Sequence, residues 1–205
     1  MFSIPSLREF SRQTIRAACS QKPVNAGVAE LLVDATMGNG HDTLFLASLA
    51  YGRGASCHVH AFDVQEKALE RTASRLAAAG LTGQAVLHLA GHEVAADILA
   101  ASKAESSPPC LRAAMFNLGF LPAADRSIVT RAENTLAALR GLLPLLLPGG
   151  VVSIQMYAGH AHGDEETEAV IRFLAELPED MWKGSLYQIC NKRRNPEYLG
   201  LVTYA

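Results

Sequence analysis

The 205-residue sequence has few cysteines and no long hydrophobic run. Its four cysteines, at positions 19, 57, 110 and 190, form no CxxC pair and are too widely spaced for the disulfide framework of a small secreted domain. The longest apolar stretch, 142–152, is interrupted by prolines and glycines, so it cannot form a membrane helix. The N-terminus has no continuous apolar segment of the kind that a secretory signal needs. These absences predict a cytoplasmic protein that makes no contact with a membrane.

The sequence also lacks a large excess of charge of either sign. It has 18 Lys and Arg against 20 Asp and Glu, a formal net charge of −2, which excludes a globally basic surface for nucleic acid but not a local basic patch. Hydrophobic residues make up 49% and charged residues 19%, a composition typical of a folded core rather than of a disordered chain. The length predicts one domain over 1–205.

From residue 30 onward, short apolar runs alternate with amphipathic segments, a pattern typical of repeated βα units around a largely parallel sheet. We expect seven strands, near 30–35, 57–63, 84–89, 111–117, 150–157, 184–190 and 198–204. We expect helices between them, near 41–50, 65–79, 92–101, 132–146 and 164–177. No helix separates the last two strands, so they should form an antiparallel pair at the sheet edge. The predicted fold class is α/β, with a seven-stranded, mostly parallel sheet covered by helices on both faces.

An additional helix is expected before the first strand. Ser6 and Glu9 have the spacing of a capping box, which predicts a helix over about 6–20. One face of this helix carries arginines at intervals of four: Arg8, Arg12 and Arg16. Such a row is either a solvated face or a contact surface for phosphate groups.

The first βα turn carries the clearest functional signal. It runs from Asp34 to Asp42 and places Gly38 and Gly40 between a buried strand and a helix, where small residues let backbone N–H groups approach a ligand. Asp63 ends the next strand, 23 residues after Gly40, where a carboxylate accepts hydrogen bonds from two ribose hydroxyls. This combination predicts a cofactor with an adenosine group.

Two cofactor types compete for such a loop, namely a dinucleotide and S-adenosylmethionine (SAM). A dinucleotide fingerprint requires a third small residue where this sequence has Thr43. Asp34 at the strand end would repel a pyrophosphate, but it could bind the cationic amino group of SAM directly or through water. The sequence therefore favours SAM, with a dehydrogenase or a purely structural glycine turn as the alternatives.

Further polar residues follow the third and fourth strands. His92 and Glu93 are candidates for adenine contacts or for a helix cap, and Asn117 lies at the carboxyl edge of the sheet, where ligands of parallel sheets bind. His160 and His162 resemble a metal-binding pair, but no acidic or cysteine set accompanies them. We therefore expect no metal.

Several segments together resemble one bacterial family. They are Asp34-Ala-Thr-Met-Gly-Asn-Gly-His-Asp-Thr43, Phe62-Asp-Val-Gln65, Gly91-His-Glu93, Met115-Phe-Asn-Leu-Gly-Phe-Leu-Pro122, Tyr157-Ala-Gly-His160 and Asn195-Pro-Glu-Tyr-Leu199. The family was first described as rRNA methylases, and its characterised members are tRNA 5-(aminomethyl)-2-thiouridine methyltransferases. The resemblance covers nearly the whole chain and departs at Met37 and at Ala90-Gly91.

The resemblance implies a Rossmann-like class I methyltransferase fold, a homodimer, and methyl transfer from SAM to the aminomethyl nitrogen of the wobble uridine in a tRNA anticodon stem-loop. By position, the methionine end of SAM would be surrounded by Gly38, Asn39, Gly40 and Asp42. The ribose would be held by Asp63 and Gln65, with the adenine near His92 and Glu93.

The remaining site residues are hypotheses about catalysis and RNA binding. Asn117 would orient the amine, and Asp125 or His160 would accept its proton. An unstacked base would lie on aromatic side chains and its phosphates on basic ones. The candidates are Phe120, Tyr157 and Tyr198 for the base and Arg8, Arg12, Arg16, Lys192, Arg193 and Arg194 for the phosphates. The alternatives are a methyltransferase for rRNA or a small amine, and a non-catalytic RNA-binding module.

Overall fold

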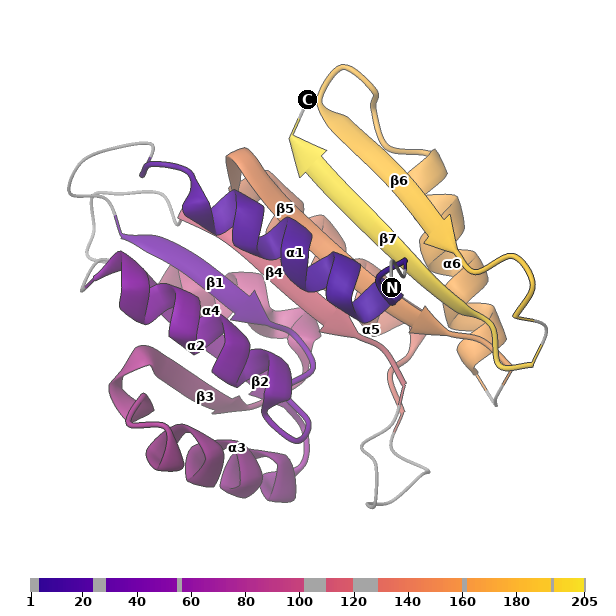
Figure 1. Ribbon diagram of the computed structural model, residues 1–205. Coiled ribbons are helices and arrows are strands. Elements are labelled where there is room, and N and C mark those ends of the chain that lie inside the picture. The colour runs from indigo at the N-terminus through magenta and orange to yellow at the C-terminus, as the bar shows by residue number, and fades with distance from the viewer. Residues whose placement is uncertain are drawn as a thin grey trace.

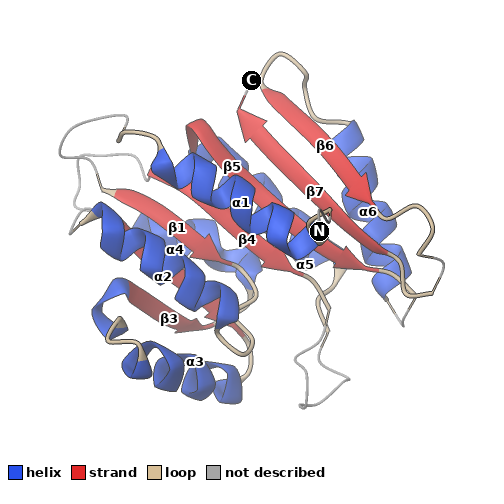
Figure 2. Cartoon of the chain, viewed as in Figure 1, coloured by secondary structure: helices blue, strands red, loops and turns tan. Residues whose placement is uncertain are grey.

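The computed structural model describes residues 4–23, 29–54, 57–101, 110–119, 129–159, 162–192 and 194–204. These residues form a seven-stranded sheet with helices on both faces (Figures 1 and 2), as predicted. The strands are β1 (Glu30–Asp34), β2 (Cys57–Asp63), β3 (Ala85–Leu89), β4 (Cys110–Asn117), β5 (Leu146–Tyr157), β6 (Trp182–Gln188) and β7 (Glu197–Tyr204). Their order across the sheet is β3-β2-β1-β4-β5-β7-β6. The first five strands in this order, from β3 across to β5, are parallel. β7 is antiparallel to both β5 and β6, which confirms the expected edge pair.

The α-helices are α1 (Leu7–Ser20), α2 (His41–Arg53), α3 (Glu66–Ala78), α4 (Ala95–Ala101), α5 (Ala132–Leu142) and α6 (Gly163–Ala175). The helix predicted over 132–146 is too long, because its last part is a 3₁₀ turn, Leu143–Leu145, and β5 begins four residues earlier than expected. Pro144 lacks a backbone N–H and therefore ends the α-helix. The helix predicted from residue 92 likewise starts with a 3₁₀ turn, His92–Val94. Among the described residues, no helix combines the length and apolar character that crossing a membrane requires.

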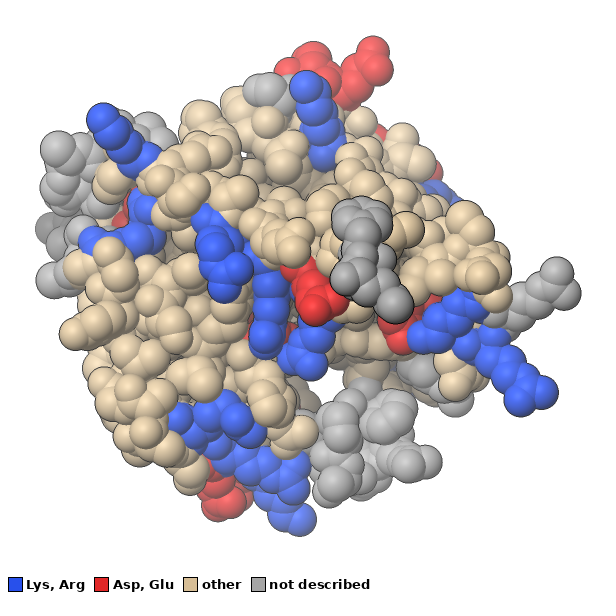
Figure 3. Space-filling view, viewed as in Figure 1, with Lys and Arg blue, Asp and Glu red and all other residues tan. Residues whose placement is uncertain are grey.

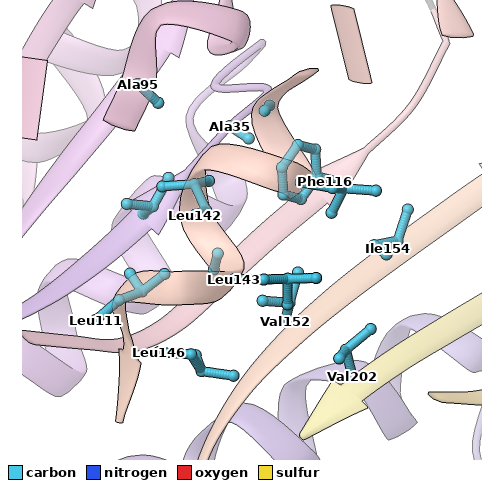
Figure 4. Close-up of a cluster of buried hydrophobic side chains, with 14 of the residues drawn as sticks. Ala35, Ala95, Leu111, Phe116, Leu142, Leu143, Leu146, Val152, Ile154 and Val202 are labelled. Atoms are coloured by element: carbon cyan, nitrogen blue, oxygen red, sulfur yellow. The ribbon is translucent and has the colours of Figure 1, made fainter. Parts of the chain in front are cut away.

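Two hydrophobic clusters separate the two faces of the sheet. One lies under α4, α5 and α6 and includes Phe116, Leu142 and Val152, which are labelled in Figure 4. The other lies under α1, α2 and α3 and includes Ile15 and Val151. Val151 and Val152 belong to different clusters because successive strand residues face opposite sides of the sheet.

The predicted N-terminal helix is present as α1, and both hydrogen bonds of its capping box form between Ser6 and Glu9. α1 packs across β4, β5 and β7 on the front face in Figure 1. In this interface, the buried hydroxyl groups of Ser11 and Ser153 lie 2.6 Å apart. α1 therefore belongs to the sheet packing and is not a free arm.

A buried ionic cluster joins several elements at the amino ends of the strands. Glu30 accepts hydrogen bonds from Arg112 Nη2 at 2.6 Å and Nε at 3.3 Å, and it also pairs with Arg53 at the end of α2. The Arg112 side chain is completely buried and donates to the Pro148 carbonyl at 3.2 Å. Burial raises the pKa of Glu30, but the arginines outweigh it and the net pKa is lowered. Glu30 is therefore an ionised carboxylate that compensates buried positive charge.

We expect Glu30→Gln to lower the free energy of unfolding by about 3–5 kcal/mol, since it leaves Arg112 buried without a counter-charge. Urea denaturation at pH 7 measures this. The matched control is Glu197→Gln, which removes a partly exposed partner of Lys192 and should cost less than about 1 kcal/mol. Equal effects of the two substitutions would contradict the special role of the buried cluster.

Candidate active site

The loop between β1 and α2 is held by both neighbouring strands. The backbone N–H of Ala35 donates to the Met115 carbonyl on β4 at 2.8 Å, and that of Met37 donates to the Phe62 carbonyl on β2 at 2.9 Å. The loop then turns into α2 at Gly40, which has φ 75° and no side-chain cap. The first N–H groups of α2 consequently point into the region at the carboxyl ends of the strands.

Contacts from α3 fix the tip of this loop. A Cβ atom on Gly40 would lie 2.6 Å from Thr72 Oγ1 and 2.9 Å from Thr72 Cα, so both the close approach and the positive φ require glycine. Arg71 donates to Asn39 Oδ1 at 2.8 Å, and Arg75 Nε donates to the Asn39 carbonyl at 2.8 Å. The predicted glycine turn is thus a rigid part of the structure.

Asp63 at the end of β2 binds the same loop. Its Oδ2 accepts a hydrogen bond from the Gly38 N–H at 2.9 Å, and its Oδ1 accepts one from the Gln65 N–H at 3.0 Å. Each carboxylate oxygen has a second lone pair, so both can accept a further hydrogen bond from a diol. This geometry fits the predicted ribose contact.

A cavity of about 220 Å³ opens beside these groups at the carboxyl ends of β1 to β4. It brings together most of the predicted cofactor residues: Gly38, Asn39, Asp42, Asp63, Gln65, His92 and Glu93. Arg8 and Asn117 also line it. Further wall residues were not predicted from the sequence: Thr36, Met37, His41, Gly119, Thr130, Arg131 and Asn134. Most of these follow strand ends or precede helices, which is the signal that could have found them.

Asp34 lies outside the wall of the cavity and is only 1% exposed. Its two oxygens accept hydrogen bonds from Thr43 Oγ1 at 2.6 Å and from the Thr36 N–H at 3.1 Å. Burial, followed by the charge of Asp42, raises the pKa of Asp34 to about 7. The described geometry makes Asp34 a support of the loop. Of the two predicted ways to bind the amino group of SAM, directly or through water, this geometry offers no direct contact.

His92 lines the cavity, but both of its ring nitrogens face protein groups. Nδ1 lies 3.1 Å from the Ala35 carbonyl, to which it donates, and Nε2 lies 3.3 Å from Thr135 Oγ1. Thr135 in turn donates to Glu166 at 2.7 Å. Burial lowers the pKa of His92. His92 therefore forms part of the cavity wall, with both ring nitrogens engaged by protein groups, and contact of His92 or Glu93 with adenine stays a prediction.

The arginine row of α1 meets the start of α2. Asp42 accepts hydrogen bonds from Arg12 Nη2 at 2.7 Å and Nε at 3.2 Å, and from Arg8 Nη2 at 3.3 Å. The guanidinium groups of Arg12 and Arg16 lie over the Phe45 ring, 5.1 and 5.4 Å from its centroid. The row is therefore not a purely solvated face, and its contact with RNA phosphates stays a prediction.

The structure describes some of the residues predicted to contact the substrate. The Asn117 N–H donates to Thr36 Oγ1 at 2.7 Å, which connects the ends of β4 and β1. Tyr157 is partly buried near Arg8 and Asp42, and burial raises its pKa to about 12. Several predicted residues fall outside the described part of the chain: Phe120, Asp125, His160 and Arg193.

Other predicted substrate contacts do not line the cavity. Tyr198 packs against the hydrophobic cluster under α4 to α6, and Tyr157 is also outside the cavity wall. Lys192 pairs with Glu197, and Arg194 is exposed in the turn between β6 and β7. Among the described residues, no group of three or more His, Cys, Asp and Glu side chains could hold a metal ion.

Comparison with known proteins agrees with this geometry. The model of the family described as "Putative rRNA methylase" matches residues 59–203. The chain belongs to this family. A crystal structure of a "putative rRNA-methylase" from Clostridium thermocellum is 32% identical, with a TM-score of 0.84 over 100% of both chains. This likeness confirms the predicted methyltransferase fold.

Two other relatives carry further information. A "putative methyltransferase" from Streptococcus mutans, solved in complex with SAH (S-adenosylhomocysteine), is 33% identical with a TM-score of 0.80 and covers 99% of this chain and 100% of its own. The chloroplastic tRNA (mnm(5)s(2)U34)-methyltransferase of Arabidopsis thaliana is 37% identical over 172 residues, or 82% of this chain. The match spans 61% of the Arabidopsis protein.

We expect Asp34→Asn to change how stability depends on pH. A carboxyl whose pKa is raised on folding favours the folded state below its unfolded pKa, near 4, and this contribution is lost as pH rises toward 7. From pH 5 to 7, the wild type should therefore lose at least about 1 kcal/mol of unfolding free energy relative to the variant. Denaturant titrations at several pH values measure this difference.

The control for this experiment is Asp97→Asn, on the exposed surface of α4. Its unfolding free energy should run parallel to that of the wild type over the same pH range. A parallel curve for Asp34→Asn as well would show that the Asp34 carboxyl is ionised throughout.

Proposed function

We propose that this protein uses SAM to methylate the aminomethyl nitrogen of 5-aminomethyl-(2-thio)uridine at the tRNA wobble position, giving 5-methylaminomethyl-(2-thio)uridine. The observation that carries the proposal is the cavity in which the glycine loop, Asp63 and Asn117 meet. The SAH complex of the Streptococcus relative supports the cofactor. The named activity of the Arabidopsis relative supports the substrate.

The residues of the cavity suit an adenosyl amino acid. Asp63 offers acceptors for the ribose, and the wall beside Glu93 offers a place for adenine. The charged pair of Arg8 and Asp42 lines the same cavity. When bound, SAM supplies a methyl group on a positively charged sulfur, which a neutral amine can attack.

For this reaction the protein must hold the substrate amine in its neutral form, with a free lone pair. An alkylamine is mostly protonated in water, and a partly desolvated cavity lowers its pKa because it penalises the charged form. Asn117 at the end of β4 would accept a hydrogen bond from the amine and aim its lone pair at the methyl carbon. As the new N–C bond forms and the C–S bond breaks, the nitrogen loses a proton, for which Asp125 and His160 remain the predicted acceptors.

A basic surface around the cavity fits an RNA substrate. Figure 3 shows Lys and Arg side chains gathered over α1 and α3, on either side of a hollow. The basic residues of these helices include Arg8, Arg12, Arg16, Lys67, Arg71 and Arg75. We infer that the anticodon stem-loop lies across this face, with its backbone near the β6–β7 turn as well. A homodimer and a cytoplasmic location stay predictions.

The test is methyl transfer from labelled SAM to tRNA that lacks the final wobble-uridine methylation, followed by nucleoside mass analysis. We expect the aminomethyl nucleoside to be converted into the methylaminomethyl nucleoside. Asn117→Ala should lower turnover at saturating tRNA and SAM by at least about 10-fold, since aligned positioning of reactants contributes strongly to rate. Asp97→Asn on α4, away from the cavity, is the control and should keep normal turnover.

Two outcomes would count against the assignment. Normal turnover of Asn117→Ala would remove the role given to Asn117. Absence of conversion by a protein that binds SAH would reject the tRNA substrate and direct the same assay to rRNA and small amines.

A second test concerns the turn between β6 and β7. Neutralising Lys192, Arg193 and Arg194 should weaken tRNA binding and flatten its salt dependence, because each lost phosphate contact lowers the slope of log K against log salt by about 0.9 for a duplex and 0.7 for a single strand. The control neutralises Arg140 and Arg172 on the opposite face of the sheet. An unchanged slope after the first substitution would exclude this turn as an RNA contact.

A further inference from the structure

One polar atom in the wall of the cavity has no partner. Arg8 Nε is buried, and the structure gives it no hydrogen bond among the described residues. A guanidinium N–H carries positive charge, so leaving it buried and unbonded costs more than leaving a neutral donor unbonded. A buried donor of this kind, in a cavity that must take a ligand, indicates that the ligand supplies the acceptor.

The contacts of Asp42 show which arginine is available. Arg12 binds this carboxylate closely, with N–O distances of 2.7 and 3.2 Å, and is further held by donating to the His41 carbonyl at 3.1 Å. Arg8 makes only long contacts with Asp42, at 3.3 and 3.5 Å, and its side chain is 42% exposed. Arg8 lines the cavity, whereas Arg12 does not. Arg12 therefore fixes Asp42, and Arg8 can turn to another anion.

We propose that Arg8 binds the carboxylate of the cofactor's amino-acid end while the adjacent Asp42 faces its ammonium group. This inference deepens the proposed function and rests on its cofactor, though not on the identity of its RNA. An amino acid is a zwitterion, and a guanidinium beside a carboxylate offers the two opposite charges that it requires.

The position of Arg8 along the cavity agrees with this assignment. The adenine and ribose contacts follow β3 and β2, at one end of the sheet order. Arg8 comes from α1, which packs over β4, β5 and β7, beyond β1 on the other side. An adenosyl group bound at Asp63 and Glu93 would therefore direct its amino-acid end toward Arg8.

An RNA phosphate could use the same guanidinium, but the surroundings favour a zwitterion. Asp42 lies within 3.5 Å of Arg8 and would repel a phosphate group, since like charges at such distances disfavour each other. The same carboxylate attracts the ammonium of an amino acid. The charge of Asp42 thus favours the zwitterionic end of the cofactor over an RNA phosphate. The experiment below separates these two ligands of Arg8.

The experiment compares two ligands by calorimetry, without RNA. One is SAH, and the other is its analogue with a 3-aminopropyl group, which lacks only the carboxylate. We expect the wild type to bind SAH at least about 10-fold more tightly than the analogue, because the analogue cannot form the charge-assisted hydrogen bond with Arg8. Arg8→Met should reduce SAH affinity by about 10-fold or more and leave analogue affinity within about 2-fold.

Two variants control the comparison. Arg8→Lys retains the charge and should recover part of the discrimination between the ligands. Arg140→Met removes an arginine from the exposed end of α5, outside the cavity, and should keep the wild-type preference. Thermal melting of each variant verifies that it is folded.

Preservation of the full preference for SAH in Arg8→Met would overturn the inference while leaving the proposed function intact. A loss of tRNA affinity and of salt dependence in that variant, with unchanged SAH binding, would assign Arg8 to an RNA phosphate instead. Failure of the wild type to bind SAH at all would overturn the cofactor assignment and this inference with it.

Discussion

One buried carboxylate, that of Glu30, holds two central strands and a helix together. It lies between two arginines, of which Arg112 is fully enclosed, and it connects the first residue of β1 with β4 and with the end of α2. A charge cluster of this kind tolerates little displacement, because any separation leaves an uncompensated charge in the interior. It fixes the central strands at their amino ends, so that their carboxyl ends meet where the ligand cavity forms.

Buried charge is compensated differently at the amino ends and at the carboxyl ends of the strands. At the amino ends, the carboxylate of Glu30 is surrounded by guanidinium donors. At the carboxyl ends of the strands, Asp34 is buried with only neutral donors, and Arg8 Nε is buried without a hydrogen-bond partner among the described residues. Incomplete compensation of these buried groups destabilises the protein and favours binding of a ligand that carries both charges. Stability and binding are thereby assigned to different ends of the same strands.

The local features of this protein could be predicted from its sequence, and the long-range ones could not. The seven strands followed from apolar runs, the glycine turn from residues adjacent in the chain, and Asp63 from its place at a strand end. The ion pair of Arg8 with Asp42 joins residues 34 positions apart, and no pattern within α1 identifies its partner. The early start of β5 was missed because Pro144, Gly149 and Gly150 obscured the apolar run.

The buried hydroxyl contact between Ser11 and Ser153 spans 142 positions of the chain. α1 leaves the ribosome well before β5 and β7, the strands on which it docks, have been synthesised. Contacts of such high sequence separation form late, since the intervening chain must first be ordered. Arg8, the arginine that α1 contributes to the cavity wall, would consequently arrive last. A nascent or partly folded chain would hold the glycine loop and Asp63 without it, and would bind the cofactor weakly until its final strand pairs.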